Sequence, residues 1–231
     1  MSQLDANVIP VSRSKLDVRK LSSLAMLTAL TYLAMLLSKI LPQVMFLQME
    51  IKSVVVAICG FLFGPVSAAA VSIVVALIEL FTVSDTGIMG CIMNALAACA
   101  FACPAAFVYR KVHTRKGAVI GLSVGVVTLV GVMLLWNYLI TPIYMEVERP
   151  VVAAMLPTLF LPFNLVKGGL NMALTLLLYK PVVGALRKAR LAPESQTTAG
   201  ASGRINAGFL MFSLALLITF VFLLLVLAKM V

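Results

Sequence analysis

Long apolar runs alternate with short polar segments along the whole chain, and this pattern predicts transmembrane helices. Most runs approach the roughly 20 residues that a helix needs to cross about 30 Å of hydrocarbon. The runs lie near 22–41, 51–63, 66–82, 88–109, 117–140, 157–179 and 207–228. The second run is short, and at 1.5 Å per residue it covers only about 20 Å. The stretch 51–82 therefore also admits a second interpretation, as one long kinked helix.

The composition indicates the same class of protein. Of the 231 residues, 62% are hydrophobic and 11% are charged, whereas a soluble globular domain carries about 25% charged residues. Alternating strands of about ten residues, which are typical of membrane barrels, are absent from the sequence. The sequence therefore predicts an all-α integral membrane protein.

The distribution of Lys and Arg predicts the topology, because cytoplasmic loops carry an excess of both. With seven spans and a cytoplasmic N-terminus, 13 of the 18 Lys and Arg residues fall in cytoplasmic segments. These segments are 1–21, 64–65, 110–116 and 180–206. A single span over 51–82 would move the basic loop RKVHTRK outside, so two spans are favoured. The net charge of +10 is then mostly a topology signal, and a nucleic-acid partner is not needed to explain it.

This topology divides the chain into four parts and places it in the cell membrane as a multi-pass protein. We expect a cytoplasmic tail, a six-helix membrane domain, a polar linker and an additional C-terminal transmembrane helix. Their bounds are 1–21, 22–190, 191–206 and 207–231. Among the outer loops, residues 141–156 are long and apolar enough to form a lid, and 43–50 have the same character.

Several polar residues interrupt the predicted spans, and all fall in the outer half of the membrane. They are Glu79, Asn94, Asn137, Asn164 and Lys167. A lysine near the centre of a membrane helix costs about 2.5–3.5 kcal/mol on insertion scales, and such a residue usually has a function. Asn164, Lys167 and Asn171 also share one helical face. We interpret the cluster as a cavity open to the outside. The alternative is interhelical hydrogen bonding, which is the role expected for the deeper Asn171.

The residues around this cavity suggest the chemistry of its ligand. The cavity offers amides, an ammonium group and one carboxylate, and aromatic or thioether side chains lie nearby in the sequence. These are Met45, Phe46, Trp136, Tyr138, Tyr144 and Phe163. Together they suit a flat heteroaromatic ligand with a polar, hydroxylated part.

The sequence lacks the motifs of an enzyme or of an autonomous pump. It contains no GxxxxGK[ST], HExxH or GxSxG stretch. The four cysteines form no CxxC pattern, so no metal site is predicted. Inverted repeats are not evident, which weakens the hypothesis of a self-sufficient carrier. A binding protein that drives uptake would then need partner subunits that supply the energy. Two sets of small residues suit close helix packing against a partner or within the bundle: Ala25 with Ala29, and Gly117, Gly121 and Gly125.

Three motifs resemble those of a known family. GFLFGP at 60–65, NYLITPIYM at 137–145 and LPFNLVKGGLN at 161–171 resemble the riboflavin-specific S component of energy-coupling factor (ECF) transporters. The similarity runs from about residue 22 to 188. It implies a six-helix bundle that binds riboflavin from outside with high affinity, as a transported ligand and not a cofactor. It also implies partnership with a T-type membrane scaffold and two cytoplasmic ATPases, and a bundle that topples to release the vitamin.

The resemblance also implies roles for individual residues. Asn137, Asn164 and Lys167 would line the vitamin pocket. The loop around Met45, Phe46 and Leu47 would cap it, while Ala25 and Ala29 would face the scaffold. Glu79 and Asn94 are added as binding candidates from their positions in the spans. The seventh helix exceeds the usual six. Two alternatives stay open: an S component for another vitamin, and a self-sufficient secondary transporter.

Overall fold

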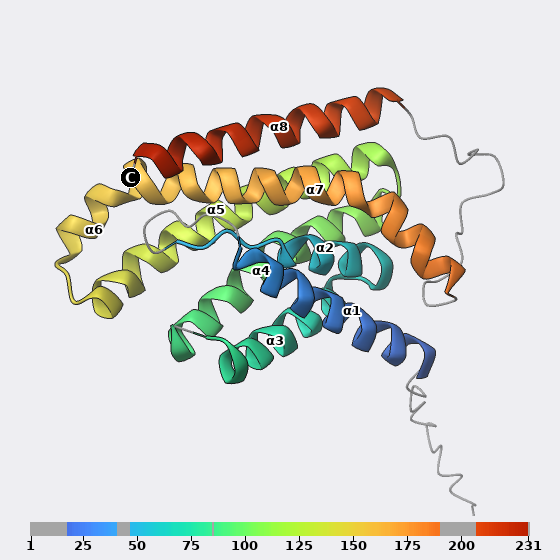
Figure 1. Cartoon of the computed structure of the whole chain (residues 1–231), viewed down its shortest axis with the longest axis horizontal. Helices are drawn as coiled ribbons and strands as arrows, with labels where there is room; N and C mark the ends of the chain where they lie inside the picture. Colours follow the sequence, from blue (N-terminus) through green and yellow to red (C-terminus); the bar gives the residue numbers. More distant parts are fainter. Residues whose placement is uncertain (1–17, 41–46, 85, 190–206, 231) are drawn as a thin grey trace, which may run out of the picture.

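The computed structural model describes residues 18–40, 47–84, 86–189 and 207–230, which form a bundle of helices (Figure 1). Six helical segments in these ranges are long and apolar enough to cross a membrane, and the apolar helix Lys52–Phe63 is shorter. The prediction of an all-α membrane protein is therefore confirmed. The elements are α1 (Val18–Ser38), α2 (Lys52–Phe63), α3 (Pro65–Thr82), α4 (Gly87–Lys111), α5 (Arg115–Met145), α6 (Arg149–Met155), the π-helical turn η1 (Leu156–Phe160), α7 (Leu161–Lys188) and α8 (Ala207–Met230).

The stretch 51–82 forms two helices, as the charge distribution predicted. Gly64 separates them with a φ of 91°, a left-handed conformation that glycine adopts without steric cost. Pro65 follows in the first turn of α3, where a missing N–H group leaves no hydrogen bond unmade. The resulting α2 has 12 residues and packs antiparallel to α3. This hairpin brings the start of α2 beside the end of α3.

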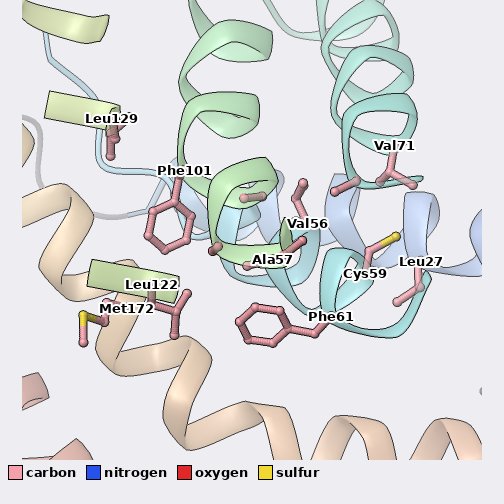
Figure 2. Close-up of a cluster of buried hydrophobic side chains, with 14 of the residues drawn as sticks. Leu27, Val56, Ala57, Cys59, Phe61, Val71, Phe101, Leu122, Leu129 and Met172 are labelled. Carbon is pink, nitrogen blue, oxygen red and sulfur yellow. The ribbon is translucent and has the colours of Figure 1, made fainter. Parts of the chain in front are cut away.

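Six helices contribute to one apolar core. Figure 2 shows side chains of α1, α2, α3, α4, α5 and α7 gathered in it. The largest fully buried members of this cluster include Phe101 of α4 and Leu122 of α5. Many positions are alanine or glycine, which lets the helix backbones approach closely. At Gly60, for example, a Cβ atom would lie 2.8 Å from Cβ of Ala106.

The glycine series of α5 packs inside the bundle. A Cβ atom at Gly121 would lie 2.7 Å from the carbonyl oxygen of Ala105, and one at Gly125 would overlap the carbonyl oxygen of Phe101. Both carbonyl groups belong to α4. Of the two interpretations of this series, internal packing is therefore the correct one, and these glycines are not a surface for another protein.

The expected lid loop at 141–156 is instead largely helical, and that prediction was wrong. Helix α5 continues to Met145, and α6, η1 and α7 form an apolar helical segment from Arg149 to Lys188. Three residues, 146–148, separate the two segments, with Glu146 in the left-handed conformation at φ 54°. Pro150 lies in the first turn of α6, where proline is compatible with helix.

Helices α1 and α8 lie on opposite sides of the bundle (Figure 1). Helix α1 packs against α2 and α3, whereas α8 packs along α7. The predicted tail and linker fall almost entirely outside the described ranges. At one end of the bundle a Cβ atom at Gly64 would lie 3.9 Å from Nη1 of Arg110. The α2–α3 turn and the basic C-terminus of α4 therefore lie at the same end of the bundle, which we call the basic end.

We predict that Gly125→Ala destabilises the fold, because its methyl group would overlap the backbone of α4. Overpacking of this kind costs about 1–3 kcal/mol. The matched control is Gly131→Ala on the same helix, where nothing lies within 4 Å of the added Cβ and the change should be neutral or stabilising. Thermal unfolding of both variants in detergent would test this, and equal melting temperatures would contradict it.

Candidate functional site

A polar cavity lies between α3, α4, α5, α7 and the segment that precedes α2. Its volume is about 150 Å³, whereas one water needs roughly 10–15 Å³ on the same measure. It is therefore far larger than a packing defect. The lining residues include Leu47, Gln48, Glu50, Glu79, Met89, Met93, Asn94, Met133, Trp136, Asn137, Thr141, Tyr144, Phe163, Asn164 and Lys167.

Lys167 extends from α7 to the segment before α2. Its Nζ lies 3.0 Å from Oε2 of Glu50 and donates to the carbonyl oxygen of Gln48 at 3.4 Å. The lysine and the glutamate are 7% and 6% exposed. The ammonium group that looked anomalous in an apolar run is thus neutralised by a carboxylate from a distant part of the chain.

Glu50 in turn belongs to a longer series of buried charges. Nζ of Lys52 lies 2.8 Å from Oε1 of Glu50 and 2.6 Å from Oε2 of Glu79. The side-chain amide of Asn94 donates to the other oxygen of Glu79 at 2.9 Å. We call Lys167, Glu50, Lys52 and Glu79 the charge chain. It contains two ammonium and two carboxylate groups, so its net charge is zero.

Pairing offsets the cost of burying these charges. An unpaired charge in a low-dielectric interior costs several kcal/mol. Glu50 precedes α2 and lies outside the helices. Burial would raise the pKa of its carboxyl group, but Lys167 and Lys52 outweigh burial and lower that pKa to about 2. Glu50 therefore stays a carboxylate throughout the physiological pH range.

Glu50 and Lys52 were missed as site residues by the sequence interpretation. Glu50 was assigned to an outer loop, and it does lie outside the helices, but its burial in the cavity wall was not foreseen. The available signal was their position, because both flank an apolar run too short to span the membrane. A short helix places the charges at its end below the surface.

Two of the three predicted asparagines lie in the cavity wall and bond to their own helical segments. Asn137 of α5 donates to the carbonyl oxygen of Met133 at 2.7 Å and accepts from the hydroxyl group of Thr141 at 3.0 Å. Asn164 of α7 donates to the carbonyl oxygen of Phe160 at 2.8 Å. Phe160 ends the π-helical turn, and such turns are frequent at functional sites.

The other candidates divide into three groups. Glu79, Asn94 and Leu47 line the cavity, as do the aromatic residues Trp136, Tyr144 and Phe163. Tyr138 does not, and it is 41% exposed. Met45 and Phe46 lie outside the described residues. Asn171 is buried away from the cavity and its Oδ1 has no hydrogen-bond partner, so this atom does not form the expected interhelical bond.

Residues 19–179 match the family described as the substrate-specific component of ECF transporters. The chain belongs to this family. It is therefore a component of a transport system and not an enzyme. The match ends before α8, the last helix of this S component.

Individual relatives support the same assignment. The S component is 27% identical to riboflavin transporter FmnP of Bacillus subtilis (strain 168) over 168 residues, which cover 66% of this chain and 86% of the relative. It is 26% identical to riboflavin transporter RibU of Staphylococcus aureus (strain TCH60) over 187 residues, which cover 76% of this chain and 98% of the relative. A solved structure of the S component of a bacterial ECF transporter shares the fold, with a TM-score of 0.61, 24% identity and coverage of 74% and 98%.

We predict that Lys52→Met strongly destabilises this S component. Glu50 would keep Lys167 as its partner, but Glu79 would lose the lysine with which it pairs. Removing one partner of a buried ion pair costs roughly 3–5 kcal/mol. Lys116→Met, at an exposed position near the start of α5, is the control. The double variant Lys52→Met/Glu79→Leu keeps the Glu50–Lys167 pair balanced and should regain part of the stability. Unfolding in detergent measures all three, and a Lys52→Met variant as stable as the control would refute the prediction.

Proposed function

We propose that this S component binds riboflavin with high affinity on the outer side of the cell membrane. It then delivers the vitamin with an ATP-driven module made of a T-type scaffold and two ATPase subunits. The observation that carries the proposal is a convergence at one cavity. Asn137, Asn164 and Lys167, the three residues that the family resemblance implied, all line it. Two relatives named riboflavin transporters match over most of their length.

The chemistry of the cavity suits riboflavin. The flavin ring is flat and presents carbonyl and N–H groups at one edge, and the ribityl chain carries hydroxyl groups. Asparagine amides can both donate to and accept from such groups. Trp136, Tyr144 and Phe163 supply flat apolar faces for stacking. The charge chain adds no net charge, which suits a neutral ligand.

The orientation and the partner surface follow from the same proposal. The basic end faces the cytoplasm by the positive-inside rule, and so does the N-terminus. On α1, Ala25 and Ala29 are exposed, as are Leu21, Leu33 and Leu37 at the same four-residue spacing. This stripe combines a small-residue notch with flanking leucines, a pattern that supports close packing of another membrane helix.

We predict that the purified protein binds riboflavin one-to-one and that Lys167→Ala weakens binding more than tenfold, about 1.4 kcal/mol. The absorption spectrum and titration of flavin fluorescence measure both. Lys116→Met serves as the exposed-lysine control. Tight binding of another vitamin in place of riboflavin would identify a different S component. Riboflavin uptake by vesicles that contain this chain alone would indicate a self-sufficient transporter.

We also predict that Ala25→Trp/Ala29→Trp abolishes association with the module and leaves riboflavin affinity unchanged. The added indole rings would prevent close approach at the notch. Leu214→Trp on α8, exposed on the other side of the bundle, is the matched control. Co-purification with co-expressed scaffold and ATPase subunits measures association. Unchanged co-purification of the double variant would show that α1 is not the partner surface.

A further inference from the structure

Helix α8 makes contacts that a simple membrane anchor would not need. Figure 1 shows it lying along α7. The guanidinium group of Arg115, at the start of α5, lies 5.9 Å from the ring centre of Phe209 near the start of α8. Towards the other end, Leu224 is only 5% exposed. Helix α8 is thus attached to the bundle near both of its ends.

The closest contact is made at a glycine of α7. A Cβ atom at Gly169 would overlap the ring of Phe220, so the ring occupies the place where another residue would have its side chain. The neighbouring Gly168 makes a similar contact with α5, where its Cβ would lie 3.0 Å from Val126. Helix α7 is therefore held between α5 and α8 at two consecutive residues.

These two glycines directly follow Lys167. Lys167 thus lines the cavity, Gly168 contacts α5 and Gly169 contacts α8. Any sideways shift of α7 at this level would also move the ammonium group against Glu50. The apolar cluster that contains Leu224 and contacts Phe220 further includes Leu47 and Phe163, both of which line the cavity. Helix α8 therefore packs into the same apolar cluster as two residues of the cavity wall.

We propose that α8 holds the binding site of this S component in its ligand-ready geometry, with Phe220 as the positioning residue that acts through Gly169 on Lys167. This inference rests on the proposed riboflavin function for its ligand but on the contacts of α8 for its mechanism. Phe220 touches no ligand. Its effect is to restrict the movement of α7, so its loss should speed ligand release.

The test compares Phe220→Ala with Phe222→Ala, which removes a ring that is 65% exposed on the same helix. Two readouts are measured in detergent. The first is the riboflavin dissociation rate. The second is acrylamide quenching of Trp136 in ligand-free protein, since Trp136 is the only tryptophan in the chain and lines the cavity. We expect Phe220→Ala to release riboflavin at least threefold faster, and acrylamide to quench its Trp136 fluorescence more readily. Phe222→Ala should match the unaltered protein in both readouts.

A double-variant comparison tests the contact itself. Gly169→Ala adds a methyl group where the ring lies, and Phe220→Ala removes the ring. If the two residues touch, the double variant releases riboflavin no faster than the worse single variant, whereas independent effects would multiply. Phe220→Leu replaces Phe220→Ala if the latter does not fold, and should lie between it and the unaltered protein.

The outcomes separate the two proposals. If the unaltered protein does not bind riboflavin, the proposed function fails, and Trp136 quenching still tests α8. If Phe220→Ala lowers only the melting temperature and leaves both readouts unchanged, α8 is an anchor and the positioning role is overturned. An equal effect of Phe222→Ala would also overturn it.

Discussion

The balanced charge chain is the constraint on which the other parts of the site depend. Its four members come from α7, from the segment before α2, from α2 itself and from α3. None of them can be buried alone, because an unpaired charge in the interior is costly. Charge balance therefore fixes the relative positions of four segments. The small residues between α2, α4 and α5 allow the close helix packing that this arrangement needs.

The charge chain also determines what a ligand encounters. Lys167 is already paired with Glu50, and it contacts the carbonyl group of Gln48 in the same segment. A ligand that approaches this ammonium group therefore meets the segment before α2 as well. The wall formed by the charge chain is polar but neutral overall, while Asn137, Asn164 and the aromatic rings lie on α5 and α7. Orientation of a ligand by hydrogen bonds, and not attraction of a net charge, follows from this distribution.

The local patterns of the sequence predicted the elements well and the pairings poorly. Apolar runs located the helices. The charge of the basic loop at 110–116 favoured two helices, α2 and α3, over one long helix. Asn137, Asn164 and Lys167 stood out because polar groups are rare in such runs. The partner of Lys167 lies 117 residues away, and no local pattern encodes that distance. Residues 141–156 were misjudged because length and apolar character do not distinguish a covering loop from a helix, and α5 continues through this stretch to Met145.

The family comparison named a class of transporter that the residues alone described only as a binding cavity. It did not extend to α8, whose docking through Phe220 became visible only in the structure, because neither residue of that contact differs locally from an ordinary membrane-helix residue. A glycine opposite an aromatic ring is informative only once the two helices are known to be adjacent.

The shortness of α2 places the charged groups at its start away from the membrane surface. Its 12 residues rise roughly 18 Å from the basic end, where about 30 Å of hydrocarbon has to be crossed. With the α2–α3 turn at one membrane surface and α2 along the membrane normal, Lys52 and its partners lie roughly 12 Å from the opposite surface. In the proposed function, a ligand that reaches Lys167 from the outer side has therefore passed about two fifths of the hydrocarbon thickness before any step driven by partner ATPases.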